Sequence, residues 1–436
     1  PPEQIDDLVG GEHRIAAVEP DDGSAHHHRG SQAKADGFQG DRIIKVGEKT
    51  IAGTKTPQDS MVRMMKGPKG TKVKITVNRA GTDIPFDITR DKIPVHCIDA
   101  AFMVNDTTGY IKLSKFTRTT YVEFLEATTE LLKQGMTSLV FDLRSNTGGY
   151  FDQAYRLANE FLKKGEKVVY MEGLHRPRQD YNADGRGKLK DIELSVLIDE
   201  GSASSSEIFS GAIQDNDRGK IIGRRSFGKG LVQEPINFTD GSGLRLTVAR
   251  FYTPSGRCIQ KPYGKDYEYD IIERYAHGEM TSADSMKVDT TSIYYTVKGR
   301  RVYGGGGIIP DVFVPMDTTK ATKFYISCNK KATPLRFASA MFDKYKSTLS
   351  EIEDFGQLEK YLDSIDLGSQ FLEYAAKVDG IKPAKGEWDE SKPYMMPHIL
   401  ALVGRYSKLD DEAFYRFYLP LDDTIQAAMN QSGIID

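Results

Sequence analysis

The sequence predicts an α/β fold, with a smaller β-rich domain before it and a helical region after it. Three observations carry this prediction: buried-type strands alternate with helices in the middle of the chain, apolar residues alternate with polar ones near its start, and helix formers dominate after residue 330. A chain of 436 residues is long for a single core, because domains usually run to about 150 residues. We therefore expect a short remnant at residues 1–10, followed by domains over residues 11–90, 91–325 and 326–436.

The middle of the chain repeats a strand followed by a helix. The apolar run TSLVFDL (137–143) is typical of a buried strand, and the helical stretch YFDQAYRLANEFL follows it after RSNTGG. The pattern then recurs as ELSVLID (193–199) with the helix EIFSGAIQD, and as the strand KIIG (220–223). Next, LVQEPINF and GLRLTVARFY flank the turn TDGSG as a hairpin. This order predicts α/β layering with an antiparallel appendage.

Residues 11–90 carry the β-rich pattern. In TKVKITVNRAGTDIPFDITR, every second residue is apolar on both sides of the turn AGTD, which predicts a hairpin with one buried face. A strand over 42–46 and a short helix with Met61, Met64 and Met65 at helical spacing precede it. The order of these elements around GDRIIKVGEKTI resembles the PDZ domain, which binds chain ends by adding them as an extra strand to a sheet edge.

The sequence departs from the PDZ pattern at the carboxylate-binding loop. A PDZ domain has a glycine-containing loop before its second strand, whereas here the chain enters through DDLVGGEHRI and HHHRGSQAKADGF. The resemblance therefore implies a peptide-binding module and leaves carboxylate capture by residues 11–40 open.

Composition excludes several classes of function. The formal net charge is -3, which gives no global field that would attract nucleic acid. No run of 18 apolar residues occurs, so we expect no transmembrane segment. The three cysteines are far apart and lack CxxC spacing, which argues against a zinc ribbon or a disulfide framework. We expect neither a metal nor another cofactor.

The stretch GSASSSEIF (201–209) places serines between a buried strand and a helix. Ser204 with Glu207 three residues later is a capping-box pattern, which favours an ordinary helix start. The same position also presents nucleophiles at the top of a sheet, with neighbouring N–H groups directed at a developing oxyanion. Local pattern alone leaves Ser202, Ser204, Ser205 and Ser206 open as nucleophiles.

A base for such a serine is suggested by GRRSFGKG (223–230). The stretch matches a phosphate-binding P-loop at every position except the last, where Gly230 replaces the Ser or Thr that binds magnesium. The strand-like LVQEPINF that follows also lacks the helix N-terminus that phosphates require. Lys229 is the better candidate for a general base, since a desolvated lysine titrates near ~7–8 and serine–lysine pairs are a variant of the catalytic triad.

Four stretches in this order, DLRSNTGG, GSASSSEIFSGAIQDNDR, GRRSFGKGLVQ and GSGLRLTVARFYTPSGR, resemble the serine–lysine C-terminal processing peptidases, also called tail-specific proteases. The resemblance implies a crotonase/protease-like α/β core. It also implies that Ser204 is the nucleophile, that Lys229 is the general base and that Gln233 orients the lysine amine.

The oxyanion hole implied by the resemblance consists of two backbone N–H groups. One belongs to Ser205, which stands where the family usually has alanine, and the other to Gly149 in preference to Gly148.

The resemblance implies a serine endopeptidase that cleaves protein substrates near their C-termini through an acyl-enzyme. Family members work outside the cytoplasm, so we expect a location in the bacterial cell envelope, in the periplasm or attached to the membrane from outside. Two alternatives stay open: a non-catalytic PDZ-type peptide-binding scaffold, and a P-loop nucleotide-binding enzyme. We expect the helical C-terminal region to serve packing or partner contact, which includes homo-oligomer formation.

Overall fold

The computed structural model describes residues 42–79, 81–91, 96–263, 267, 269–317 and 322–431. The predictions for residues 1–41, including the carboxylate-binding loop, lie outside the described residues. The chain divides into two compact units. One contains Pro1–Val95 and Thr322–Phe414, and the other contains His96–Ala321 and Tyr415–Asp436.

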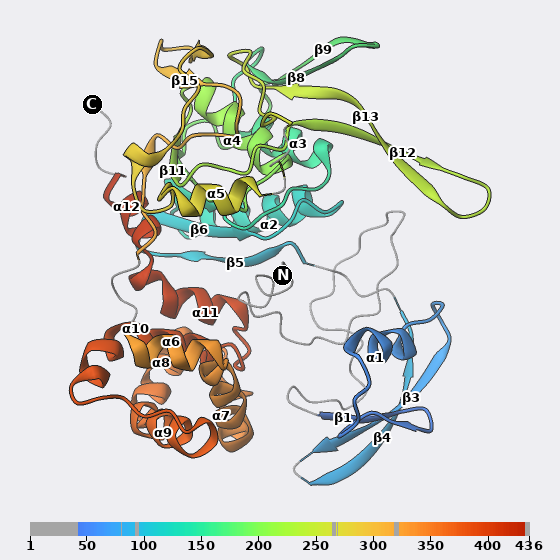
Figure 1. The fold of residues 1–436 in the computed structure, drawn as a ribbon, viewed down its shortest axis with the longest axis vertical. Helices are drawn as coiled ribbons and strands as arrows, with labels where there is room; N and C mark the ends of the chain where they lie inside the picture. Colours follow the sequence, from blue (N-terminus) through green and yellow to red (C-terminus); the bar gives the residue numbers. More distant parts are fainter. Residues whose placement is uncertain are drawn as a thin grey trace. The chain divides into compact units, whose positions relative to one another are not determined.

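The larger unit is built on a six-stranded sheet with the order β16-β11-β10-β7-β6-β5 (Figure 1). Its strands are β5 (Ile98–Met103), β6 (Thr108–Leu113), β7 (Ser138–Asp142), β10 (Glu193–Ile198), β11 (Lys220–Gly223) and β16 (Val312–Phe313). Neighbouring strands run parallel, except that β5 is antiparallel to β6. This confirms the predicted α/β core.

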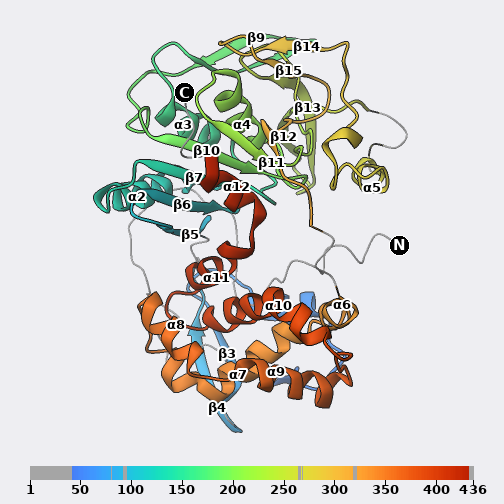
Figure 2. The ribbon, with the colours of Figure 1, turned by 90° about the vertical axis from the view of Figure 1, so that its left-hand side faces the viewer.

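Both faces of this sheet are covered, which explains why its strands are continuous apolar runs. Leu139 and Phe141 of β7 face the helices α2 (Thr120–Lys133), α3 (Phe151–Phe161) and α4 (Ser205–Asp215) in one buried cluster. Val140, between them, lies in a second cluster with Leu419, Ile425 and Ala428 from the C-terminal end of the chain. Figure 2 shows α12 (Asp423–Gln431) beside the strands of the core sheet.

A second, antiparallel sheet has the order β12-β13-β8-β9. It contains β8 (Lys167–Gly173), β9 (Arg176–Asn182), β12 (Leu231–Asn237) and β13 (Gly243–Tyr252). The hairpin of β12 and β13 is the predicted antiparallel appendage, and it extends from the body of the unit in Figure 1. The chain then forms α5 (Asp270–Ala276), the short 3-10 helix η3 (Ala283–Ser285), β14 (Ile293–Tyr295) and β15 (Arg301–Tyr303).

The N-terminal part of the other unit is a four-stranded antiparallel sheet with one helix. Its elements are β1 (Arg42–Val46), β2 (Lys49–Thr50), α1 (Gln58–Met65), β3 (Lys72–Arg79) and β4 (Thr82–Thr89), with the strand order β2-β1-β3-β4. Ile75 pairs with Phe86 and Val77 with Ile84, so the predicted hairpin is confirmed. The methionines of α1 pack against the buried cluster that contains Ile75 and Val77.

The C-terminal part of the same unit is helical, as predicted. It comprises α6 (Lys323–Lys330), α7 (Thr333–Leu349), α8 (Phe355–Asp363), α9 (Leu367–Tyr374), η4 (Ala375–Asp379), α10 (Glu387–Gly404) and the start of α11 (Asp411–Tyr418). The predicted helical range 326–436 divides in the structure, because Tyr415–Asp436 belongs with the core unit. The physical reason is the apolar surface of η5 (Leu419–Leu421) and α12, which covers one face of the core sheet. No helix among the described residues is long and apolar enough to cross a bilayer.

A buried charge network fixes the end of β7. The Asp142 carboxylate is fully buried and accepts hydrogen bonds from Tyr110 Oη (2.8 Å), Lys112 Nζ (3.3 Å) and Arg144 Nη2 (2.6 Å). Arg144 Nη1 also donates to Asp422 Oδ1 (2.8 Å), which ties the C-terminal segment to this strand end. Burial opposes ionisation of Asp142, but the charges of Arg144 and Lys112 outweigh it and hold its carboxyl pKa well below the usual range.

The substitution Asp142→Asn should lower the free energy of unfolding by about 3–5 kcal/mol at neutral pH, because it removes the counter-ion of the buried Lys112 and one of the two counter-ions of Arg144. Since the pKa is depressed in the folded state, this contribution is present above the ordinary value of 3.8 and is lost as pH falls below it. Urea unfolding at a series of pH values measures the difference between the two proteins.

The exposed Asp240, which bonds Ser242, provides the control. Asp240→Asn should leave the urea midpoint unchanged. If the difference in free energy of unfolding between wild type and Asp142→Asn did not shrink on acidification, the stabilising role of the Asp142 charge would be contradicted.

Candidate active site

The loops that follow three neighbouring strands meet at one edge of the core sheet. The strands β7, β10 and β11 are adjacent and parallel, so their carboxyl ends lie together. We call residues 143–149, after β7, the glycine loop and residues 224–230, after β11, the lysine loop. The turn after β10 leads into Ser204. All residues predicted to be catalytic, except Gln233, therefore gather at this edge.

Ser204 occupies a strained turn between β10 and α4. Its backbone has φ 55° and ψ −110°, and such positive φ values are uncommon for residues other than glycine. Strain of this kind persists only where the surroundings enforce it, and it concentrates at functional sites. Here the following helix is fixed in the core by Phe209 and Ile213, both completely buried. The fold thus holds Ser204 at the start of an immobilised helix.

Glu207 joins the turn of Ser204 to the lysine loop. Its carboxylate is completely buried and accepts hydrogen bonds from four donors. These are Ser204 N (2.8 Å), Lys229 N (2.8 Å), Gly228 N (2.6 Å) and Ser226 Oγ (2.6 Å). Burial raises the pKa of the Glu207 carboxyl, and the four donated hydrogen bonds oppose that shift. The predicted helix cap is present, but its carboxylate also holds the backbone of the lysine loop.

The rival serines are engaged in backbone contacts. Three hydroxyls donate to carbonyl oxygens: Ser202 to Leu143 (2.8 Å), Ser205 to Gly149 (3.0 Å) and Ser206 to Asn146 (2.8 Å). Ser204 is different, because its hydroxyl donates to no acceptor among the described residues. The structure therefore distinguishes one serine where the local sequence pattern could not.

The glycine loop lies directly against this serine. A Cβ on Gly148 would come within 2.8 Å of Ser204 Cβ and 2.9 Å of Ser205 N, so the loop can approach only without a side chain there. The N–H of Gly148 donates to Asn146 Oδ1 (2.9 Å). In the described part of the chain, the N–H groups of Ser205 and Gly149 donate no hydrogen bond. Two amide donors thus remain available next to Ser204.

The side chains of Lys229 and Gln233 lie outside this network. Lys229 is exposed, and no described residue forms a hydrogen bond or ion pair with its Nζ. Gln233, on the exposed part of β12, is paired in register with Thr247 and donates to its Oγ1 over 3.4 Å. The structure brings the backbones of Ser204 and Lys229 to one carboxylate, but it shows no contact between Ser204 Oγ, Lys229 Nζ and Gln233.

The lysine loop is not arranged as a phosphate cradle. The N–H groups of Gly228 and Lys229 point to Glu207, and the N–H of Gly230 donates to Gln260 Oε1 (3.0 Å). The loop continues into the strand β12 from Leu231. These amides are therefore unavailable to a nucleotide. Nor do three His, Cys, Asp or Glu side chains gather as a metal site within the described ranges.

Sequence analysis missed two supports of the glycine loop. Asp199, at the end of β10, accepts hydrogen bonds from the N–H groups of Ser145 (2.7 Å) and Gly201 (3.0 Å). Asn146 Nδ2 donates to Leu113 O (2.9 Å) and anchors the loop to β6. The available signals were an Asp directly after the buried strand that ends at Ile198 and an Asn in the loop after the strand that ends at Asp142, since such side chains bond nearby backbone groups in turns.

The substitution Glu207→Gln should lower the free energy of unfolding by about 1–3 kcal/mol, because the amide NH₂ would face N–H donors and leave them unsatisfied. Urea unfolding measures this loss. Hydrogen exchange should accelerate at Gly228 and Lys229, whose amides are the ones released. The exposed Glu172→Gln is the control, and equal midpoints for the two variants would refute the role of this carboxylate.

Comparisons with known proteins find similarity to serine proteases. The model of peptidase family S41 matches residues 107–271. A probable CtpA-like serine protease of Staphylococcus saprophyticus is 37% identical over 249 residues, which are 57% of this chain and 49% of that protein. Its counterpart in Staphylococcus haemolyticus is 36% identical over 231 residues, 53% of this chain and 45% of that protein. The chain spans about half the length of the curated relatives it matches.

Solved structures give a weaker likeness, over about two thirds of the chain. The photosystem II D1 C-terminal processing protease is 27% identical, with a TM-score of 0.37 and coverage of 66% of each chain. A putative S41 protease from Bacteroides fragilis is 15% identical, with a TM-score of 0.37 and coverage of 69% of this chain and 75% of the other. The similarity of sequence is therefore concentrated in residues 107–271, the part of the chain that matches the model of peptidase family S41.

Proposed function

We propose that this chain is a serine endopeptidase that cleaves protein substrates near their C-termini through an acyl-enzyme on Ser204. The observation that carries the proposal is the Glu207 carboxylate, which binds the backbone of Ser204 and of Lys229 at once. A nucleophile and its base must be held within reach of each other, and this carboxylate fixes the two segments that carry them.

Ser204 is the proposed nucleophile. Its hydroxyl donates to no described acceptor, whereas the neighbouring serines donate theirs to backbone carbonyls. Oγ would attack the scissile carbonyl carbon while its proton passes to Lys229 Nζ. The protonated amine would then give this proton to the leaving amine, which releases the C-terminal fragment and leaves an ester on Ser204. Water would then attack the ester carbonyl while its proton passes to Lys229 Nζ, and the protonated lysine would return that proton to Ser204 Oγ, which frees the N-terminal fragment with a new carboxyl group.

The N–H groups of Ser205 and Gly149 are the proposed oxyanion hole. Neither donates elsewhere among the described residues; Ser205 follows Ser204 in the chain, and the carbonyl of Gly149 accepts a hydrogen bond from Ser205 Oγ (3.0 Å). The N–H of Gly148 is already bonded to Asn146, which favours Gly149 as the second donor. Amides that are fixed before the reaction stabilise the negative charge of the tetrahedral intermediate without reorganisation.

Lys229 is the proposed base and Gln233 the residue that orients it. For proton transfer, Nζ must come within about 2.6–3.2 Å of Ser204 Oγ, a contact that catalytic groups often form only when substrate is bound. The exposed position of Lys229 leaves its side chain free to make this rotation. The hydrogen bond from Gln233 to Thr247 is long at 3.4 Å, so Gln233 can give up this bond and contact Lys229 at little cost in free energy.

The PDZ-like domain is the proposed receptor for substrate tails. Its described part is an open sheet with β2 and β4 at the edges, and a peptide can join such an edge as an additional strand. We also propose that the protein works in the bacterial cell envelope, where CtpA-like proteases meet their substrates.

A non-catalytic peptide-binding scaffold is the second candidate. The observation that favours it is the missing contact between Ser204 Oγ and Lys229 Nζ in the described structure. A fluorophosphonate probe separates the cases. Labelling of Ser204 without added peptide would indicate an active site. Labelling only in the presence of peptide would indicate a site that substrate activates, and no labelling at all would indicate the non-catalytic scaffold.

Ser204→Ala and Lys229→Ala should each lower the rate of digestion of a disordered protein by at least about a thousandfold, because each removes a member of the proton-transfer pair. Ser210→Ala is a matched control. Ser210 lies in the same helix, is completely buried, and its hydroxyl has no described hydrogen-bond partner, so this variant should keep full activity. A Ser204→Ala protein as active as wild type would refute the proposed nucleophile.

Substrates with a free C-terminal carboxylate should be cleaved about tenfold faster at low concentration than the same peptides with a C-terminal amide. The amide lacks the charge, so it loses the hydrogen bonds that a carboxylate would accept from the protein. The measurement is kcat/KM for both forms. Peptides with a blocked N-terminus provide the control. Equal values for acid and amide would refute tail recognition while leaving the chemistry at Ser204 untouched.

A further inference from the structure

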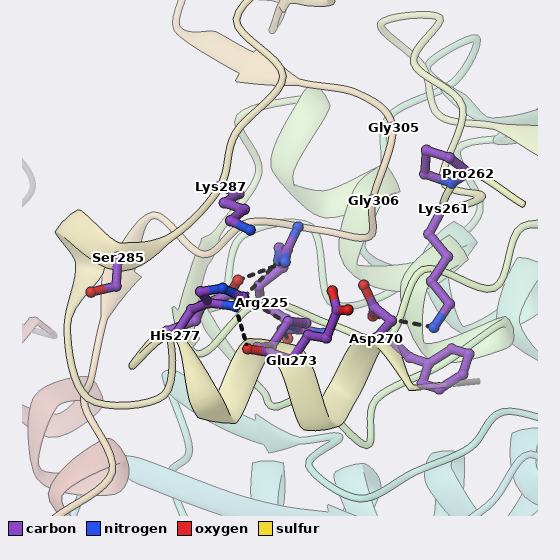
Figure 3. A pocket seen from close by; sticks show the side chains of 13 residues that line it. Arg225, Lys261, Pro262, Asp270, Glu273, His277, Ser285, Lys287, Gly305 and Gly306 are labelled. Carbon is purple, nitrogen blue, oxygen red and sulfur yellow. Dashed lines mark hydrogen bonds and ion pairs between the residues drawn. The ribbon is translucent and has the colours of Figure 1, made fainter. Parts of the chain in front are cut away.

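A segment beyond the matched peptidase family region lies against the lysine loop. The family model ends at residue 271, within α5, and the chain after it forms η3, β14 and β15. Together with Arg225 and Phe227 of the lysine loop, this segment lines a pocket of about 150 Å³ (Figure 3). The pocket borders the very loop that carries the proposed base.

We infer that Glu279 is a positioning residue for Lys229, and that it holds the lysine loop through Arg225 and Arg274. The inference rests on the proposed function, because it assigns Glu279 a role in placing the proposed base. Glu279 touches neither Ser204 nor Lys229 in the described structure, so its effect would pass through the two arginines.

Glu279 binds both guanidinium groups at short distances. Its Oε1 accepts from Arg225 Nε (2.7 Å) and Arg274 Nε (2.8 Å), and its Oε2 accepts from Arg225 Nη2 (2.6 Å). The Glu279 residue is only 3% exposed. Figure 3 shows Arg225 among the side chains of this pocket, with His277, Glu273 and Lys287 nearby. Burial makes these charge-assisted bonds resistant to screening by salt.

Arg274 transmits this contact to the backbone of the lysine loop. Its Nη2 donates to Arg225 O (2.7 Å) and its Nη1 donates to Ser226 O (3.1 Å). Ser226 Oγ in turn donates to Glu207. The lysine loop is therefore held at one end by Glu279 and Arg274, and at the other by the Glu207 carboxylate. Lys229 follows Ser226 by three residues.

The balance of charge makes Glu279 the critical member. The buried Arg274 and the half-buried Arg225 share this carboxylate, and burial together with the neighbouring Arg225 lowers the pKa of Arg274. The other acids that line the pocket are Asp270, which pairs with Lys261 (3.2 Å), and Glu273, whose side chain is exposed. Removal of the Glu279 charge would leave the guanidinium groups of Arg225, in the lysine loop, and Arg274 in mutual repulsion.

The first test measures the loop itself and requires no activity. Hydrogen exchange of full-length Glu279→Gln should be at least about tenfold faster than wild type over residues 225–230, because the backbone contacts that protect them are weakened. The matched control is Asp215→Asn. Asp215 is equally buried and pairs with Arg257, yet it makes no described contact with the lysine loop. This control should leave exchange at 225–230 unchanged.

The second test measures kinetics on an unfolded protein substrate. Glu279→Gln should lower kcat at least about tenfold with KM within about threefold of wild type, because the base is misplaced while substrate contacts remain. Glu279→Asp should restore part of kcat. Where Glu279→Gln does not fold, Arg274→Lys serves instead, since it keeps the charge and removes the paired bonds to the two carbonyl groups.

Unchanged exchange over 225–230 in Glu279→Gln would overturn the inference, as would an equal loss of kcat in Asp215→Asn. An inactive wild-type enzyme would overturn the proposed function alone, because the exchange measurement would still report whether Glu279 holds the loop.

Discussion

The buried carboxylate of Glu207 is the interaction on which the arrangement of this site depends. A charge placed in the interior is costly unless donors surround it, and here three backbone N–H groups and one hydroxyl do so. Those donors come from two segments separated by more than twenty residues, the turn of Ser204 and the lysine loop. The same hydrogen bonds that satisfy the carboxylate therefore align the two segments. A change at Glu207 would affect both the stability of the fold and the placement of Ser204 and Lys229.

The sheet supplies the frame in which this carboxylate can act. Because β7, β10 and β11 are adjacent and parallel, the glycine loop, the Ser204 turn and the lysine loop leave the sheet at one edge. The strained backbone of Ser204 is tolerated because α4 is packed on one face of the sheet. On the other face, the C-terminal segment closes the core, and its Asp422 binds Arg144 at the start of the glycine loop.

The backbone of the site is fixed more firmly than its reactive side chains. Glu207 holds the lysine loop from the core, and Glu279 with Arg274 holds it from the segment that follows the matched family region. The side chains of Lys229 and Gln233 are exposed by contrast. This division suits an enzyme whose base completes its contact only when a substrate chain arrives, since the loop needs no rearrangement and one side chain has to move.

The sequence by itself determined the α/β core, the hairpins and the helical region, because strand and helix periodicity are local, and its ordered motifs indicated the resemblance to the serine–lysine peptidases. It also placed Ser204 at a helix start with Glu207 as its cap. Tertiary structure decided the rest. Three features of the structure depend on contacts between segments that are distant in sequence. Glu207 also binds Gly228 and Lys229, and the hydroxyls of Ser202, Ser205 and Ser206 donate to backbone carbonyls. Residues 415–431 cover one face of the core sheet. No local pattern encodes such contacts, because only the packed sheet brings the partners within reach.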